Sequence, residues 1–378
     1  MKIAMNVTRD YLGGITISNV NLLNFLHGKG RGVLGIELIG QRQVSGAIAF
    51  RHLSPDWFEH QIINIHDMPI MKKIVTSGNV KDLERKYRPI IKIIKSILKK
   101  GKPDVVLLNG TYYMPWLISI AANELKIPIV LRYAGVLTKE TEHMKPKARK
   151  IFNQMEKSFM NRVDAFIFPS NLCKDVVEKE IYKKSVKRAF VIPNPINIPY
   201  SEAVSRTVER RVAAIGRWDY VKNFGDFFKI HSILKKQKWV HSASFVTGSA
   251  KIKKMPPSIN RVAQMSSEGI VEFYKTQGLV ICPSIFETFG NVPMEAASLG
   301  VPVLVNENVG CAEILKMSGL ERMVMPFDDL KAVAERVKEL CGQYILPKQL
   351  NNLRRYLNKK IINEQIVAVL KEAVDLGK

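Results

Sequence analysis

The sequence has few of the residues that mark disulfide-linked, metal-binding or membrane-spanning proteins. Its four cysteines form no CxxC pair, which predicts buried, reduced thiols rather than a disulfide framework; they are Cys173, Cys282, Cys311 and Cys341. The seven histidines lack the spacing of metal ligands. No apolar run reaches about 18 residues, so we expect no membrane-spanning helix. These absences predict a protein that uses neither a metal ion nor a disulfide.

The amino terminus, MKIAMNV, lacks the apolar segment and the small-residue cleavage site of a signal peptide. We therefore interpret it as the first strand of the mature protein and expect a cytoplasmic location. Hydrophobic residues make up 46% of the chain and charged residues 24%, which is typical of a globular protein. A length of 378 residues exceeds one ordinary domain and favours two.

Positive charge is concentrated in the first half. Residues 1–195 contain 32 Lys/Arg and 16 Asp/Glu, a net +16, and the remainder contains 26 and 18, a net +8, which together make +24. Such an excess favours a polyanionic partner, whether nucleic acid, an acidic membrane surface or an anionic substrate. Aromatic residues make up only 8% and do not cluster with the basic runs, so a stacking platform for nucleic acid is not expected.

Short Val/Ile-rich runs alternate with longer helical patterns. The runs are nearly continuous in apolar residues, as strands buried on both faces should be. They lie at 2–7, 33–38, 104–109, 127–131, 165–168, 190–192, 211–215, 243–247, 279–283 and 301–305. Helical patterns lie at 15–26, 83–100, 115–125, 223–235 and 293–299, and the tail from Pro347 onward indicates two more helices. This alternation predicts an α/β protein with parallel, doubly wound sheets.

A proline-rich stretch, VIPNPINIPYSEAVSRTVERR, interrupts the alternation near residues 194–208. We place a domain boundary there. The predicted organisation is an N-terminal domain over residues 1–197, a second domain over 198–355, and a terminal helix over 356–378 that packs back on the first domain.

The segment ICPSIFETFGNVPMEAASLGVPVLV, residues 281–305, combines features of a ligand site. Gly290 allows a close approach of backbone to a ligand, and a helix expected to begin near Pro293 offers unpaired N–H groups to a phosphate. Glu287 in the loop and Glu295 in the expected first helical turn are good acceptors for sugar hydroxyls. The combination indicates a nucleotide-sugar. By themselves, however, the two acids are better explained as a solvated loop residue, Glu287, and a first-turn acid favoured by the helix dipole, Glu295.

This segment resembles the E-x7-E signature of the retaining glycosyltransferases of family 4, the group 1 enzymes of the GT-B fold. The matching positions are Pro283, Ser284, Glu287, Phe289, Gly290, Glu295, Ala296, Gly300, Pro302 and Val303. The resemblance covers roughly residues 1–340 and is strongest in the second half. It implies two Rossmann-like domains that face a cleft, with the acceptor on the N-terminal side and the nucleotide-sugar donor on the C-terminal side.

Two further segments extend the resemblance. AAIGRWDYVKNF is similar to the family's G-R-x4-K segment, and YLGGITISNVNLLNFL is similar to its glycine-pair loop. The resemblance implies that Arg217 and Lys222 hold the donor diphosphate, where two cations can stabilise the developing charge without a metal. Gly13 and Gly14 would then let the first loop approach the diphosphate.

The remaining roles also follow from the resemblance. Glu295 would bind the ribose hydroxyls, and Glu287, with backbone N–H groups nearby, would face the donor sugar. The full set of expected substrate-binding residues is Gly13, Gly14, Gly216, Thr288, Phe289, Gly290, Asn291, Val292 and Glu295. One position departs from the family pattern, because Ala134 stands where relatives often have a histidine, which puts the contacts to the donor sugar in doubt.

The helix expected at residues 88–100, RPIIKIIKSILKK, carries isoleucines on one arc and lysines on the opposite arc. It is either a core-facing helix with a solvated lysine face or a surface that binds anionic lipid headgroups. The second possibility would make the protein peripheral on the inner face of the membrane.

The expected function is a retaining, metal-independent and cofactor-free glycosyltransferase. It would move a hexose-type sugar from a UDP- or GDP-sugar to a glycan or lipid-linked acceptor, in polysaccharide or glycoconjugate synthesis, with no nucleic-acid partner. Two alternatives stay open: an inactive relative of the fold that binds nucleic acid or membrane, and a sugar-nucleotide epimerase. The sequence names neither the nucleotide and sugar nor the acceptor and linkage.

Overall fold

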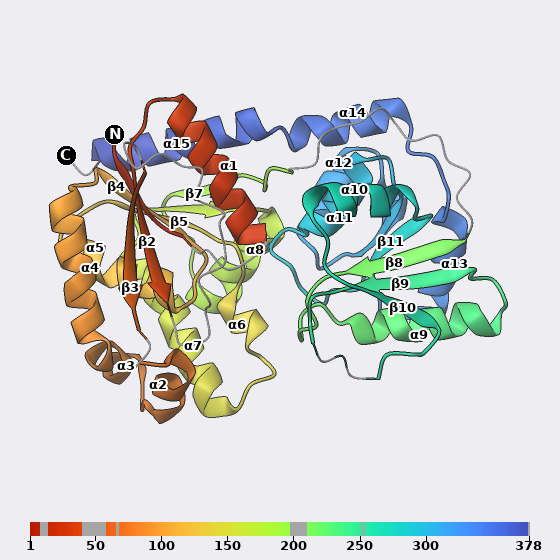
Figure 1. The fold of residues 1–378 in the computed structure, drawn as a ribbon, viewed down its shortest axis with the longest axis horizontal. Coiled ribbons are helices and arrows are strands. Elements are labelled where there is room, and N and C mark those ends of the chain that lie inside the picture. The colour runs from red at the N-terminus through yellow and green to blue at the C-terminus, as the bar shows by residue number, and fades with distance from the viewer. Residues whose placement is uncertain are drawn as a thin grey trace. The chain divides into compact units, whose positions relative to one another are not determined.

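The computed structural model describes residues 1–7, 14–39, 58–65, 68–196, 210–250, 252 and 254–376. The chain divides into two compact units, of which unit 1 comprises Met1–Pro195 with Lys360–Lys378, and unit 2 comprises Ile196–Lys359. Each unit contains a β-sheet covered by helices (Figure 1). The stretch 197–209, which holds most of the predicted boundary region, lies outside the described residues.

Unit 1 contains a seven-stranded sheet in the order β3-β2-β1-β4-β5-β6-β7, and every described strand pair in it is parallel. Its strands are β1 (Ile3–Asn6), β2 (Val33–Ile39), β3 (Phe58–Asn64), β4 (Val105–Asn109), β5 (Ile129–Arg132), β6 (Ala165–Phe168) and β7 (Ala189–Val191). Every residue of β1, β4, β5 and β6 is buried, which explains their continuous apolar sequences.

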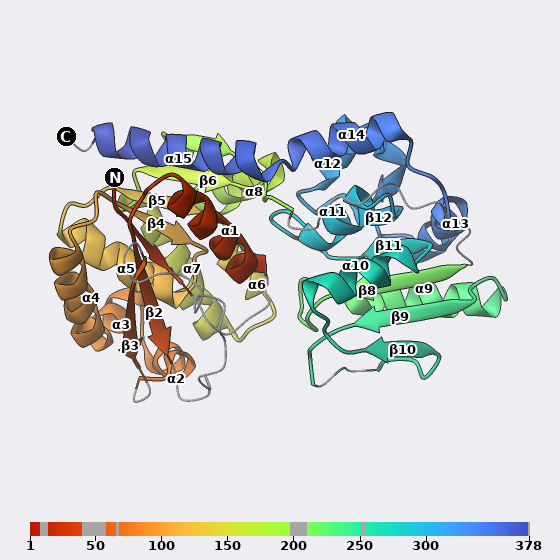
Figure 2. The same ribbon diagram turned by 45° about the horizontal axis from the view of Figure 1, so that its top comes forward.

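Helices cover both faces of this sheet. They are α1 (Gly14–Gly28), α2 (Ile70–Thr76), α3 (Val80–Lys86), α4 (Arg88–Gly101), α5 (Tyr113–Glu124), α6 (Leu137–Glu140), α7 (Pro146–Ser158), α8 (Asn171–Val176) and α15 (Lys359–Leu376). A short 3₁₀-helix, η1 (Phe159–Asn161), and a π-helix, η2 (Val177–Tyr182), follow α7 and α8. Leu22 of α1 and Ile366 of α15 share one core with Ile3 and Met5 of β1, so both helices lie on the same face of the sheet (Figure 2).

The isoleucine arc of the basic helix, α4, faces the core. Its residues Ile90, Ile91, Ile94 and Leu98 are buried, while Ile93 is 46% exposed. On the opposite arc Lys92 and Lys99 are exposed, whereas Lys95 is partly buried and pairs with Glu124 of α5.

Unit 2 repeats the same topology with six strands, in the order β10-β9-β8-β11-β12-β13, and the described pairs are again parallel. Its strands are β8 (Arg211–Ile215), β9 (Ser242–Val246), β10 (Ile259–Val262), β11 (Leu279–Cys282), β12 (Val303–Asn306) and β13 (Val324–Met325). Its helices are α9 (Phe224–Lys236), α10 (Ser267–Lys275), α11 (Asn291–Ser298), α12 (Ala312–Met317), η3 (Glu321–Met323), α13 (Leu330–Leu340) and α14 (Pro347–Tyr356).

The predicted fold class, two doubly wound α/β units, is confirmed. All ten predicted strands are present, and the sequence patterns missed only β3, β10 and β13 of the described strands. Strand β3 contains Glu59, His60 and Gln61, and β10 contains Asn260 and Arg261, because both strands lie at the edge of a sheet and one side of each is open to solvent. Strand β13 has only two residues, too few to produce a pattern.

The described cysteines are all free thiols, as predicted, and Cys173, Cys282 and Cys311 are buried. Across the part of the chain that the structure describes, we find no helix that combines the length and the apolar character needed to cross a bilayer.

Candidate active site

A charged pair lies at the carboxyl edge of the unit 2 sheet. Glu287 follows strand β11, and Lys222 lies in the loop between β8 and α9. The Nζ atom of Lys222 is 2.7 Å from Oε2 of Glu287, and the two side chains are 24% and 13% exposed. The pair is thus largely shielded from water but still accessible to a ligand.

The other carboxylate oxygen of Glu287, Oε1, contacts two side chains of the segment that precedes it. Ser284 donates its hydroxyl to Oε1, and the thiol of Cys282 lies 3.5 Å from the same atom. The backbone of Glu287 is also fixed, because its N–H donates to the carbonyl of Asn308 and its carbonyl accepts from the N–H of Gly310. Glu287 therefore has a defined orientation before any ligand binds.

Opposing effects set the charge of this pair. Burial raises the pKa of Glu287, but the nearby Lys222 ammonium and the hydrogen bonds from Lys222 and Ser284 outweigh burial, so the pKa falls below its usual value. Burial lowers the pKa of Lys222, but the charge of Glu287 outweighs it, and that pKa rises. Both groups are therefore charged near neutral pH.

The loop that carries Lys222 is shaped by its glycine and an aspartate. Gly216 has φ 154°, and a Cβ there would lie 2.9 Å from the ring of Phe224. Asp219 accepts a hydrogen bond from the N–H of Lys222, which fixes the end of the loop. Arg217, in contrast, is 76% exposed and lies 3.8 Å from Asp219. The structure thus brings Lys222 to Glu287 and leaves Arg217 on the surface.

Helix α11 begins earlier than the sequence predicts. Its first residue is Asn291, and Gly290 precedes it with φ 98°. A Cβ on Gly290 would lie 2.6 Å from Cγ1 of Val309, so a side chain cannot be accommodated there. The predicted start near Pro293 is wrong, because the first N–H groups of a helix need no intrahelical partner and a proline can occupy any of them.

This earlier start places Glu295 in the second turn of α11, which corrects its predicted place in the first turn. Its Oε2 atom accepts a hydrogen bond from the hydroxyl of Tyr274, at 3.0 Å. Burial raises the pKa of Glu295 to about 7, and the Tyr274 hydrogen bond only partly opposes that rise. Glu295 is therefore oriented by the Tyr274 hydrogen bond and not by the dipole at the first turn of α11.

The remaining predicted residues fall into three groups. Thr288 and Phe289 are buried, at 7% and 1% exposure, so their side chains pack inside unit 2. Asn291 and Val292 are half-buried at the start of α11. Gly14 is the first residue of α1, and Gly13 lies outside the described residues.

The sequence pattern gave no role to three residues that contact the two acids. Ser284 belongs to the signature, but the pattern indicates no contact for it; the sequence predicts only a buried thiol at Cys282, and Tyr274 lies outside every motif. Their contacts depend on which side chains the fold brings together, so spacing along the chain carries no signal for them.

The carboxyl edge of the unit 1 sheet contains a buried carboxylate of a different kind. Glu156 of α7 is fully buried and accepts hydrogen bonds from the N–H groups of Leu137 and Thr138, at 2.9 and 2.7 Å, and from the hydroxyl of Thr111, at 3.1 Å. Burial raises its pKa in spite of these bonds. Glu156 thereby caps α6, just after the loop that contains Ala134.

Arg132, the last residue of β5, is also buried, at 4% exposure. Its guanidinium donates to the hydroxyl of Ser18, at 2.6 Å, and to Oδ1 of Asn194, at 2.8 Å, which are both neutral groups. Burial lowers the pKa of Arg132 to about 10, so the residue remains cationic at neutral pH. These bonds join α1 and the segment after β7 to the edge of the sheet.

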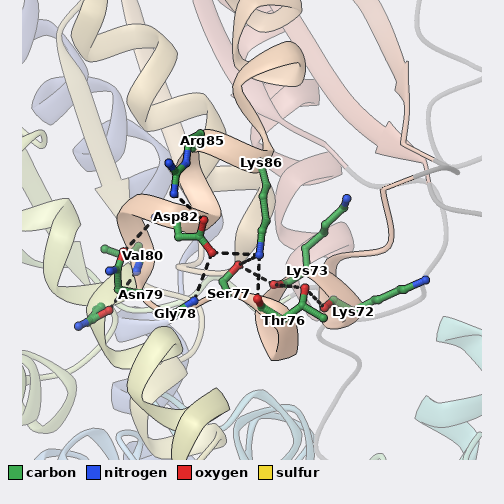
Figure 3. A network of polar contacts seen from close by, with 11 residues as sticks. Lys72, Lys73, Thr76, Ser77, Gly78, Asn79, Val80, Asp82, Arg85 and Lys86 are labelled. Atoms are coloured by element: carbon green, nitrogen blue, oxygen red, sulfur yellow. Dashed lines mark hydrogen bonds and ion pairs between the residues drawn. The ribbon is translucent and has the colours of Figure 1, made fainter.

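Some of the positive charge of unit 1 is neutralised internally. Asp82 accepts hydrogen bonds from Arg85, from Lys86 and from the N–H of Gly78 (Figure 3), and the bonds from Lys86 and Arg85 lower its pKa to about 2. Lys72 and Lys73 enter this network only through their backbone carbonyls, and their ammonium groups point away from it (Figure 3).

The architecture defines a class of protein. Sucrose-phosphate synthase from Thermosynechococcus elongatus superimposes with a TM-score of 0.74 over 98% of each chain, at 17% sequence identity. That likeness identifies the fold as GT-B, the arrangement of two doubly wound units found in many glycosyltransferases.

The family follows from the sequence models. The model for "Glycosyl transferases group 1" matches residues 204–360, and the model for "Glycosyltransferase Family 4" matches residues 54–199. The chain therefore belongs to the group 1 glycosyltransferases of family 4.

Two curated relatives are similar over part of their length. A 42.6 kDa protein of the cps region of Klebsiella pneumoniae is 24% identical over 60% of this chain and 64% of its own length. The amylovoran biosynthesis glycosyltransferase AmsD of Erwinia amylovora is 27% identical over 36% of this chain and 42% of its own length. The chain thus matches less than two thirds of the length of either relative.

Proposed function

We propose that this protein is a glycosyltransferase that moves a hexose-type sugar from a UDP- or GDP-sugar to a glycan or lipid-linked acceptor, with retention and without a metal. The observation that carries the proposal is the Lys222–Glu287 pair, 2.7 Å apart and largely buried beside the start of α11. A cation and a carboxylate held together at a helix N-terminus suit a ligand that has both phosphates and hydroxyls.

The two residues of the pair would have different roles in sugar transfer. Lys222 would stabilise the charge that develops on the leaving diphosphate, and the first N–H groups of α11 would add to that field. Glu287 would accept hydrogen bonds from the hydroxyls of the donor sugar. Arg217, exposed in this structure, would turn toward the diphosphate when a donor binds. The leaving phosphate oxygen would then take the proton of the acceptor hydroxyl.

We place the acceptor on unit 1 and the reaction in polysaccharide synthesis. The name of the relative AmsD refers to amylovoran biosynthesis, which supports a role in polysaccharide synthesis. Unit 1 also carries most of the excess charge of the chain. Exposed Lys92, Lys99 and Lys100 on α4 lie near the exposed Ile93, a composition that suits a peripheral contact with anionic lipid.

The test is a screen of the purified full chain for slow hydrolysis of UDP- and GDP-sugars, followed by the Glu287→Gln variant. We expect one donor to be hydrolysed and the variant to lose about 100-fold in rate, since a positioned polar group typically contributes that much. The anomeric configuration of the product, read by NMR, tests retention. Hydrolysis at the parental rate in Glu287→Gln would refute the site, and no turnover of any donor would refute the activity.

A further inference from the structure

Tyr274 of helix α10 is an unusual neighbour for a carboxylate. The residue is completely buried in the core of unit 2, yet its hydroxyl lies 3.0 Å from Oε2 of Glu295 on α11. The carbonyl of Val292 is farther away, at 3.4 Å. A phenol has a single proton to donate, so the bond to the carboxylate takes it.

This bond leaves one side of Glu295 available. Among the described residues, no hydrogen bond reaches Oε1, whereas Tyr274 occupies Oε2. A carboxylate oxygen has two lone pairs, so Oε1 can accept hydrogen bonds from two adjacent hydroxyls. The bond from a buried phenol is charge-assisted and fixes the carboxylate in one orientation.

We propose that Tyr274 is a positioning residue for a ribose site: it holds Oε2 of Glu295 so that Oε1 meets the 2′- and 3′-hydroxyls of a bound nucleotide. The inference rests on the proposed function, which supplies the nucleotide. Glu295 contacts the ligand, and Tyr274 acts only through Glu295.

The surroundings of Glu295 make the site sensitive to pH. Tyr274 of α10 donates to its carboxylate, and Arg354 of α14 donates through Nε to the carbonyl of Ser298 on the same helix as Glu295. Helix α10 has three charged residues: Glu272 and Lys275 pair with each other, and Glu268 lies in the first turn, where hydrogen bonds lower its pKa. Among the described residues, burial and the Tyr274 hydrogen bond set the pKa of Glu295, and burial raises it to about 7.

A consequence for binding follows from that pKa. Only the ionised carboxylate accepts from both ribose hydroxyls, so binding strengthens as pH rises through about 7. The hydrogen bond from Tyr274 lowers the pKa of Glu295, so its loss must raise that pKa further. The midpoint of the binding curve then moves to higher pH.

The experiment compares UDP and GDP with their 2′,3′-dideoxy analogues by calorimetry on the full chain, between pH 6 and 8.5. For the parent protein we expect the analogues to bind about tenfold more weakly, the loss typical of a hydrogen bond to a charged group. In Tyr274→Phe the affinity ratio of each nucleotide to its dideoxy analogue should fall below about threefold. The midpoint of the curve of binding against pH should move to higher pH.

The matched control is Tyr182→Phe, which removes another buried hydroxyl, 2.9 Å from that of Tyr133 in unit 1. It should keep the parental ratio and midpoint, which separates positioning from a general loss of stability. If Tyr274→Phe does not fold, Glu295→Gln serves instead and should abolish both the ratio and the pH dependence.

The outcomes distinguish this inference from the proposed function. A folded Tyr274→Phe with the parental ratio and midpoint overturns the role of Tyr274 alone. If the parent protein binds UDP or GDP and the dideoxy analogues with equal affinity, the ribose site is overturned. Failure of the parent to bind either nucleotide overturns the proposed function as well.

Discussion

The two units each hold a buried carboxylate at the carboxyl edge of a parallel sheet, and they use it differently. Glu287 of unit 2 pairs with Lys222, whose side chain is 24% exposed, and the pKa of Glu287 is lowered. Glu156 of unit 1 accepts hydrogen bonds from two backbone N–H groups and a threonine hydroxyl, with no cation among its partners in the described residues, and its pKa is raised. The sheets have the same topology, so the fold does not dictate this difference.

The comparison separates a carboxylate available to a ligand from one committed to the fold. Lys222 is a flexible, partly exposed cation that can change partner from a carboxylate to a phosphate. The N–H groups of Leu137 and Thr138 have no such freedom, because they belong to the first turn of α6. We therefore expect loss of the Lys222–Glu287 pair to affect mainly activity and loss of Glu156 to affect mainly stability.

The largest expected effect is that of Lys222→Met on sugar transfer. Removing the cation should lower the rate about 100- to 1,000-fold, because a fixed charge near the leaving group acts mostly in the transition state. The measurement is the transfer or hydrolysis rate with the donor found in the screen. Lys229→Met is the control, since Lys229 is 68% exposed and pairs only with Asp226 on the same helix. Equal rates in both variants would contradict the comparison.

A smaller but clear effect should follow from Glu156→Ala. The change leaves the N–H groups of Leu137 and Thr138 buried without an acceptor, which should cost about 2 to 4 kcal/mol in unfolding free energy. Hydrogen exchange read by mass spectrometry can follow unit 1 separately from unit 2. Glu142→Ala, at a nearby side chain that is 40% exposed, should change stability by less than about 0.5 kcal/mol. If the hydrogen-exchange protection of unit 1 is unchanged in Glu156→Ala, Glu156 does not stabilise the fold.

The smallest effect is on the pH dependence of stability, and its sign differs between the two acids. The folded pKa of Glu287 is lowered, so its contribution is present above the usual pKa of about 4.5 and is lost as pH falls through the folded value. The folded pKa of Glu156 is raised, so unit 1 instead loses stability as pH rises from about 4.5 to that value.

This difference can be measured as exchange protection between pH 3.5 and 8. Glu287→Gln should reduce the stability that unit 2 loses on acidification, and Glu156→Gln should reduce the stability that unit 1 loses as the pH rises. The same slope in both units would contradict the assigned charge states.

Much of the fold could be predicted from the sequence, because buried parallel strands leave continuous apolar runs. The missed strands show the limit of that signal: β3 and β10 lie at sheet edges, where polar residues face solvent, and β13 is too short for a pattern. The sequence predicts that α11 starts near Pro293, but it starts two residues earlier, at Asn291. A proline in the first turn of a helix does not identify the first position.

The sequence by itself determined the alternation of strands and helices, the glycine that precedes α11, and the acids at Glu287 and Glu295. Only the tertiary structure decided which groups these acids meet. Lys222 reaches Glu287 because β8 pairs with β11, and Tyr274 reaches Glu295 because α10 and α11 pack in one core. Charge state and orientation depend on such neighbours, and neighbours far apart in the chain leave no periodic pattern along it.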